Sequence, residues 1–73
     1  MSIEIYKTRV QIIVSNKAFN KDIDCLNCFG LIIDYSKDRD YYTVEFEYVD
    51  QNGEIDTEIA FLKRNEFIII DDK

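Results

Sequence analysis

The chain has 73 residues, five tyrosines and five phenylalanines, and its formal net charge is −6. Its 47 % hydrophobic content is too high for a disordered chain, and a chain of this length forms one domain, residues 1–73. There is no proline and there are only two glycines, which excludes a collagen-like repeat, a flexible linker and a glycine-rich phosphate loop.

No apolar run reaches the roughly 18 residues of a membrane-spanning helix, and the first residues lack the apolar centre of a signal peptide. We therefore expect a cytoplasmic protein that does not bind a membrane.

The first half of the chain predicts two strands separated by a long loop. Residues 3–14 are rich in β-branched side chains, which is typical of a strand that becomes buried. Residues 15–27 are polar and irregular, and a loop of this length in a small domain often carries function. Residues 28–35 predict a second strand, in which Gly30 indicates a bulge or a close approach of two backbones. Residues 36–40 form a charged turn.

The centre of the sequence predicts a β-hairpin. Residues 41–49 and 54–61 both alternate apolar and polar side chains, and Asn52 and Gly53 between them are the strongest short-range signal for a tight hairpin turn. A two-residue loop places Gln51 opposite Glu54. This register puts Val44, Phe46, Ile59 and Phe61 in the core, and it stacks Glu45, Glu47, Asp56 and Glu58 on the exposed face, with Glu47 directly opposite Glu58.

The chain closes with a single 3-10 turn over residues 62–66, an apolar strand over residues 67–70 and a charged end over residues 71–73. Five short strands with one turn before the last predict an all-β fold, a small five-stranded SH3-like barrel. The segments 30–33, 42–46 and 62–67, together with Gly53, resemble small SH3-like barrel domains, which include uncharacterised bacterial families and the KOW and Tudor-like groups. The resemblance spans about residues 8–70 and implies a fold without a single activity. The peptide-binding SH3 group matches less well, because the chain has no tryptophan and no ALYDY-type motif.

Cys25 and Cys28 form a C-x-x-C pair without the partners that a zinc site needs. A closed zinc site has four ligands, and the chain has no histidine and no third cysteine. Asp22 and Asp24 lie close by in the sequence, but a site of two cysteines and two aspartates is uncommon, and a four-cysteine site would need two chains. The pair also lacks the βαβ context of a redox motif. We expect two inert, partly buried thiols and no cofactor.

The carboxylates could be imagined as general acids and bases, but the sequence offers no cleft to separate their pKa values. With no histidine and no activated hydroxyl, we do not expect an enzyme.

Charge divides the chain into a basic first third and an acidic remainder. Residues 1–21 hold four bases against one acid, and residues 22–73 hold fourteen acids against five bases. The bases Lys7, Arg9, Lys17 and Lys21 leave nucleic-acid binding as an alternative. Stacking of bases on Tyr35, Tyr41, Tyr42, Tyr48 or Phe29 would need a basic groove, whereas aspartates surround these rings in the sequence. We expect most of these rings to be core and one or two to form an exposed rim.

The acidic stretch is the feature that most favours a function. Residues 34–58 hold nine acids and two bases. A charged sheet face can simply prevent aggregation, but a face of one sign suits a basic partner. We expect a monomer or homodimer that binds a basic surface, on a partner that handles nucleic acid, as an inhibitor of the immunity-protein, antitoxin or phage anti-defence type. The expected binding residues are Glu45, Glu47, Asp56, Glu58, Asp34, Asp38 and Asp40. The alternatives are an accessory subunit of a larger complex and a KOW- or Tudor-like nucleic-acid-binding domain.

Overall fold

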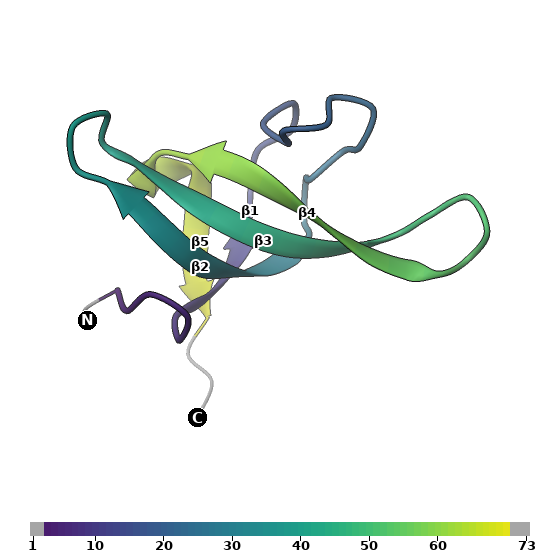
Figure 1. Ribbon diagram of the computed structural model, residues 1–73, viewed down its shortest axis with the longest axis horizontal. Helices are drawn as coiled ribbons and strands as arrows, with labels where there is room; N and C mark the ends of the chain where they lie inside the picture. The colour runs from purple at the N-terminus through teal and green to yellow at the C-terminus, as the bar shows by residue number, and fades with distance from the viewer. Residues whose placement is uncertain (1–2, 71–73) are drawn as a thin grey trace.

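The computed structural model describes residues 3–70, which form five antiparallel strands and one short helix. The strands are β1 (Arg9–Ile12), β2 (Phe29–Ser36), β3 (Tyr41–Val49), β4 (Ile55–Leu62) and β5 (Phe67–Ile70), and the 3-10 helix η1 (Arg64–Glu66) precedes β5. They form one sheet in the order β4-β3-β2-β1-β5 (Figure 1). The predictions of an all-β fold, of five strands and of a single 3-10 turn before the last are confirmed.

The sheet coils on itself without closing into a barrel. Within residues 3–70, β4 and β5 are its two edge strands, and no ladder joins them. The sequence predicts a small five-stranded SH3-like barrel, and in the structure these five strands form a sheet that is not closed into a barrel. Coiling still brings β5 close to β3. The rings of Phe67 in β5 and Tyr42 in β3 contact each other edge to face, with 5.4 Å between their centroids. This contact encloses the core on one face of the sheet.

The N-terminal strand is shorter than predicted. Only residues 9–12 of the expected strand over residues 3–14 pair with neighbours. Ahead of β1 the chain turns, with a positive φ of 65° at Tyr6 and a hydrogen bond from the Glu4 backbone N–H to the Thr8 hydroxyl (2.7 Å). The expected long loop over residues 15–27 is confirmed, with one isolated bridge between Ala18 and Ala60. The charged end, residues 71–73, lies outside the described residues.

Gly30 is a site of close backbone approach. A Cβ atom at this position would lie 2.6 Å from a side-chain carbon of Val44 and 2.7 Å from the carbonyl oxygen of Glu45. The approach was one of the two predictions for Gly30 and is confirmed, whereas the bulge of β2 lies further along. The register with β3 shifts between Ile32 and Asp34, so Ile33 is the extra residue.

The turn between β3 and β4 has three residues instead of two, and this changes the register. Asp50 pairs with Glu54 through a backbone hydrogen bond of 2.8 Å, and Gly53 takes a positive φ of 81°, as in three-residue hairpin loops. The Asp50 carboxylate selects this loop by accepting hydrogen bonds from the backbone N–H groups of Asn52 and Glu54, both at 2.9 Å.

With the longer loop, Glu58 lies opposite Phe46 and Glu47 lies opposite Thr57. The predicted pair of Glu47 and Glu58 is wrong, because a shift of one residue moves every side chain of one strand to the other face.

The core lies on the inner face of the coiled sheet. Phe46 and Val44 are fully buried, as predicted, but Ala60 and Leu62 of β4 fill the places expected for Ile59 and Phe61. Ile59 and Phe61 are half-buried on the outer face. The buried set is Val10, Ile12, Ala18, Cys25, Ile32, Val44, Phe46, Ala60, Leu62 and Phe67.

Candidate functional site

The seven acidic residues predicted to bind a partner lie in three separate places. Asp38 and Asp40 lie in the β2–β3 turn and Asp34 lies near the end of β2 beside it, at the far end of β3 from the β3–β4 turn. The nine residues of β3 lie between these two ends, which corresponds to roughly 30 Å of strand. Figure 1 shows the two turns at opposite ends of the strand pair. Glu45 and Glu47 lie on the outer face of the sheet, and Asp56 and Glu58 lie on the inner face of the hairpin. The single acidic stripe predicted for the hairpin is therefore wrong.

A different acidic group forms where the long loop meets the β3–β4 hairpin. A shallow hollow of about 520 Å³ lies between them, and its lining includes Asp22 and Asp24 from the loop and Tyr48 and Asp50 from the hairpin. Asp56 faces Tyr48 across the ladder, and Glu58 is the next residue along on the same face. We refer to Asp22, Asp24, Tyr48, Asp50, Asp56 and Glu58 as the Tyr48 surface. No lysine or arginine among residues 3–70 lines its hollow.

The electrostatics of Tyr48 reflect this gathering of acids. Burial raises the pKa of the Tyr48 phenol above its ordinary value, and the charges of Asp56, Glu58 and Asp50 raise the pKa further. A negative phenolate would stand among carboxylates. The same field favours a positively charged group brought close to Tyr48.

The loop acids are positioned by local hydrogen bonds and by two apolar anchors. The Asn20 side chain accepts from the backbone N–H of Asp22 (3.1 Å), and the Asp24 carboxylate accepts from that of Leu26 (3.0 Å). Between these turns Ile23 packs on the core, and Cys25 is fully buried. Two features of the sequence could have indicated an ordered loop, namely the single apolar residue Ile23 and the two Asx-type turns. Neither feature shows that the loop lies next to Tyr48.

Two large apolar side chains lie on the outer side of the same hairpin. Val49 and Ile55 face each other next to the turn and are 66 % and 71 % exposed. The hairpin projects beyond the rest of the sheet (Figure 1). Exposed apolar residues beside charged ones are typical of surfaces that bind other proteins.

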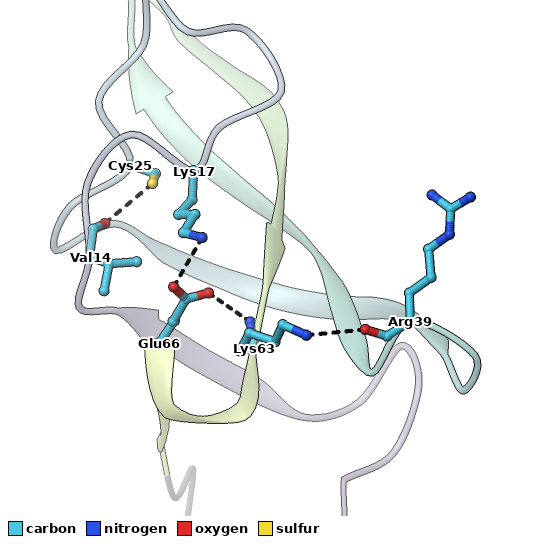
Figure 2. Close-up of polar contacts among 6 residues, drawn as sticks. All are labelled: Val14, Lys17, Cys25, Arg39, Lys63 and Glu66. Atoms are coloured by element: carbon cyan, nitrogen blue, oxygen red, sulfur yellow. Dashed lines mark hydrogen bonds and ion pairs between the residues drawn. The ribbon is translucent and has the colours of Figure 1, made fainter.

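The two cysteines lie where the long loop enters β2. The Cys25 thiol donates to the Val14 carbonyl oxygen at 3.4 Å (Figure 2). Cys28 is half-buried, and burial, the neighbouring Cys25 and Asp24 raise the pKa of its thiol. A raised thiol pKa lowers nucleophilicity at neutral pH. Within residues 3–70, no three cysteine, aspartate or glutamate side chains are grouped closely enough to hold a metal ion.

The basic residues of the first third do not form one patch. The Lys17 ammonium makes an ion pair with Glu66 at 3.1 Å (Figure 2), and Glu66 also accepts from the backbone N–H of Lys63 (2.8 Å), which closes the turn before β5. Lys7 pairs loosely with Glu4 at 3.9 Å. The Lys17 charge therefore supports the fold around η1.

A groove of about 480 Å³ on the outer face brings basic and aromatic side chains together. It is lined in part by Tyr6, Lys7, Arg9 and Phe29, with Glu45 and Glu47 at its other side. Tyr6 and Phe29 are 68 % and 58 % exposed. Of the five rings considered from the sequence, Phe29 and Tyr35 are exposed and Tyr41, Tyr42 and Tyr48 are half-buried. The expectation that most of them are core is therefore wrong, because none of the five is fully buried.

Comparison with models of known protein families, with curated proteins and with solved structures finds no match to this chain. None of the described residues forms a helix that is long and apolar enough to cross a membrane.

Proposed function

We propose that the protein is a small acidic protein-binding module and that its Tyr48 surface contacts a basic surface on a partner protein. The observation that carries the proposal is the convergence of five carboxylates, from the long loop and from the hairpin, around one tyrosine. Like charges held together cost stability unless a partner or solvent compensates them. Charge of one sign also speeds the encounter with a partner of opposite sign.

The projecting hairpin supplies the second part of the proposed interface. Val49 and Ile55 expose apolar side chains near the tip of the hairpin. The next pair along the ladder, Tyr48 and Asp56, belongs to the Tyr48 surface on the opposite face. Apolar contacts surrounded by charged groups are the usual anatomy of a transient protein interface.

We also propose that the fold belongs to the small SH3-like group. The strand order and the 3-10 turn before β5 support this proposal.

An inhibitor of the immunity-protein, antitoxin or anti-defence type is the form of this function that we favour. Proteins that handle nucleic acid carry the clustered lysines and arginines that this surface would complement. An accessory subunit that docks in a larger complex would use the same surface, and the identity of the captured partner separates the two.

The test compares two charge reversals of equal size. In Asp22→Lys/Asp56→Lys, two carboxylates of the Tyr48 surface become cations, whereas in Asp34→Lys/Asp38→Lys the same change is made at the β2–β3 turn. Affinity capture from the native host should recover a basic partner with the wild type and with the turn variant. The Tyr48 surface variant should bind that partner at least about tenfold more weakly, or about 1.4 kcal/mol. Equal binding by both variants would refute the proposal.

The outer groove favours one other candidate, a nucleic-acid-binding module of the KOW or Tudor-like kind. Tyr6 and Phe29 could stack on bases, with Lys7 and Arg9 beside them. Titration with single-stranded RNA at low and at moderate salt tests this candidate. Binding that weakens steeply with salt and is lost in Tyr6→Ala/Phe29→Ala would establish it in place of the acidic module.

A further inference from the structure

The strand β4 lies at an edge of the sheet. One side pairs with β3 along its whole length, and the other side has backbone contacts only in the C-terminal half, among residues 3–70. The ladder with β3 covers all eight residues. On its other side, within residues 3–70, the only bridge joins Ala18 to Ala60, and the Phe19 backbone N–H donates to the Ile59 carbonyl oxygen at 2.7 Å. Among residues 3–70, no strand lies along the other side of residues 55–58, in the projecting part of the hairpin.

The backbone groups on this open side belong to the odd-numbered residues. Asp50 and Glu54 form a hydrogen-bonded pair, and such pairs alternate along an antiparallel ladder. Asp56 and Glu58 therefore bond to β3, while the N–H groups of Thr57 and Ile59 point to the open side. The bond from Phe19 to the Ile59 carbonyl agrees with this assignment.

Carboxylates of the Tyr48 surface occupy both of these outward N–H groups. The Asp56 carboxylate accepts from the Thr57 N–H at 2.8 Å, and the Glu58 carboxylate accepts from the Ile59 N–H at 3.0 Å. This arrangement covers an edge that could otherwise pair with any strand. A neutral strand would displace both carboxylates. The exposed Asp56 would be hydrated, but the half-buried Glu58 would lose its hydrogen bond without gaining a new partner, which is costly. A strand with lysine or arginine at the facing positions would supply partners for both.

The two faces of the edge also differ in character. Asp56 and Glu58 lie on the inner face with Tyr48, whereas Ile55, Thr57 and Ile59 lie on the outer face, with Val49 opposite Ile55. Because side chains alternate along a strand, a matching strand would carry basic residues at every second position and apolar residues between them.

We propose that the open edge of β4, from Ile55 to Glu58, accepts an extended segment of the partner protein, with alternating basic and apolar residues, as an added strand. Strand addition of this kind takes affinity from backbone hydrogen bonds and specificity from alternate side chains. The inference rests on the proposed function, since it names the form in which the basic partner binds.

The first experiment uses three strand-length synthetic peptides. One alternates lysine and valine, one has the same composition in blocks, and one alternates glutamate and valine. With ¹⁵N-labelled protein, the alternating lysine peptide should slow hydrogen exchange at the Thr57 amide and should bind at least about tenfold more tightly than either other peptide. Equal binding of the blocked peptide, or protection at Tyr6 and Phe29 in place of β4, would overturn the proposal.

The second experiment removes one edge donor. Thr57→Pro deletes an N–H that points away from β3, and proline is tolerated at such edge positions. Thr57→Ala removes the side chain but keeps the donor. After thermal unfolding has shown both to be folded, only Thr57→Pro should lose the alternating peptide, by at least about tenfold. If the Thr57→Pro variant does not fold, the double variant Asp56→Asn/Glu58→Gln is used in its place. This pair keeps acceptors at the edge and should abolish the preference for lysine over glutamate peptides.

The captured partner separates this inference from the proposed function. A partner lost by Asp22→Lys/Asp56→Lys but retained by Thr57→Pro would leave the acidic module standing and overturn strand addition. Loss by Thr57→Pro with full binding by the charge-reversed protein would refute a basic partner.

Discussion

Phe46 and Glu58 face each other across the β3–β4 ladder on the inner side of the sheet. Phe46 is fully buried, and Glu58 is half-buried at the border between the core and the Tyr48 surface. The same two strands therefore hold the core at one end and the acidic surface at the other. Loss of packing at Phe46 should affect both.

Phe46→Ala should remove most of the stability of the domain. Truncation of a buried phenylalanine costs about 3–5 kcal/mol, and a domain of this size has roughly 5 kcal/mol to lose. Phe29→Ala is the matched control, because Phe29 is exposed on the outer face, and it should change stability by less than about 1 kcal/mol. Urea unfolding followed by circular dichroism measures both. A Phe46→Ala variant as stable as Phe29→Ala would contradict the placement of the core.

Gly30→Ala should also destabilise the protein, by overpacking. Its new methyl group would meet Val44 and the Glu45 carbonyl at less than 3 Å, and such crowding costs about 1–3 kcal/mol. Gly53→Ala has open space around it but keeps a positive φ, which costs about 1–2 kcal/mol. Gly53→Asn should recover most of this loss, because asparagine adopts that conformation readily, whereas Gly30→Asn should be worse than Gly30→Ala. Thermal unfolding of the four variants would show whether space or backbone conformation limits each glycine.

The local sequence signals were sufficient for β2 to β5, but they overestimated the length of the first strand and were insufficient for the hairpin register. Alternation and Asn52-Gly53 correctly placed β3 and β4. The loop length was decided by one side chain, since the Asp50 carboxylate binds two backbone N–H groups and stabilises a three-residue loop. The turn propensity of Asn-Gly describes only the two central residues of the turn, and it does not include these two hydrogen bonds to the Asp50 side chain. One residue of difference moved Glu58 and Asp56 to the face opposite Glu45 and Glu47.

The Tyr48 surface depends on contacts that no local pattern contains. Asp22 and Asp24 share a hollow with Tyr48 because Ile23 and Cys25 anchor the long loop against the core. The sequence likewise does not show whether the five strands close into a barrel, because the order of strands along the chain does not show whether the two edge strands pair. Composition alone leads to the prediction of an acidic site, which stays a prediction. Asp22 and Asp24 of the long loop were not among the residues predicted for it, because residues 15–27 were singled out only as a loop of a length that often carries function.

Stability at alkaline pH should report on Tyr48. The pKa of its phenol is raised in the folded protein, so the folded state binds the proton more tightly than the unfolded state does. The stability that the protonated Tyr48 phenol contributes should be fully present below about pH 10, its unfolded pKa. This contribution should be lost as the pH rises from there through the folded pKa. Tyr48→Phe should show a smaller fall over the same range. Urea titrations between about pH 8 and 11 on both proteins measure this, and parallel curves would contradict it.

The cysteines should be slow to react in the folded protein. Cys25 is fully buried, and the raised pKa of Cys28 leaves little thiolate at neutral pH. Alkylation with iodoacetamide, followed by mass spectrometry, should modify Cys28 more slowly than a free thiol peptide and should modify Cys25 only in denaturant. Cys25→Ser/Cys28→Ser should lose stability through the buried hydroxyl at position 25 and should retain partner binding. Rapid labelling of Cys25 without denaturant would show that the loop opens.

Asp50→Ala should loosen the turn that sets the face of Asp56 and Glu58. The substitution removes the acceptor for the Asn52 and Glu54 N–H groups, at a cost of about 1–2 kcal/mol, whereas Asp50→Asn keeps an acceptor and should lose less. In both the wild type and Asp50→Asn, NMR should show contacts between the α protons of Glu47 and Thr57, which face each other in the ladder. Asp50→Ala should weaken these contacts and the slow exchange of amides near the turn. An α-proton contact between Tyr48 and Thr57 in the wild type would instead establish the two-residue loop, in which these two residues form a non-hydrogen-bonded pair, and would place all four hairpin acids on one face.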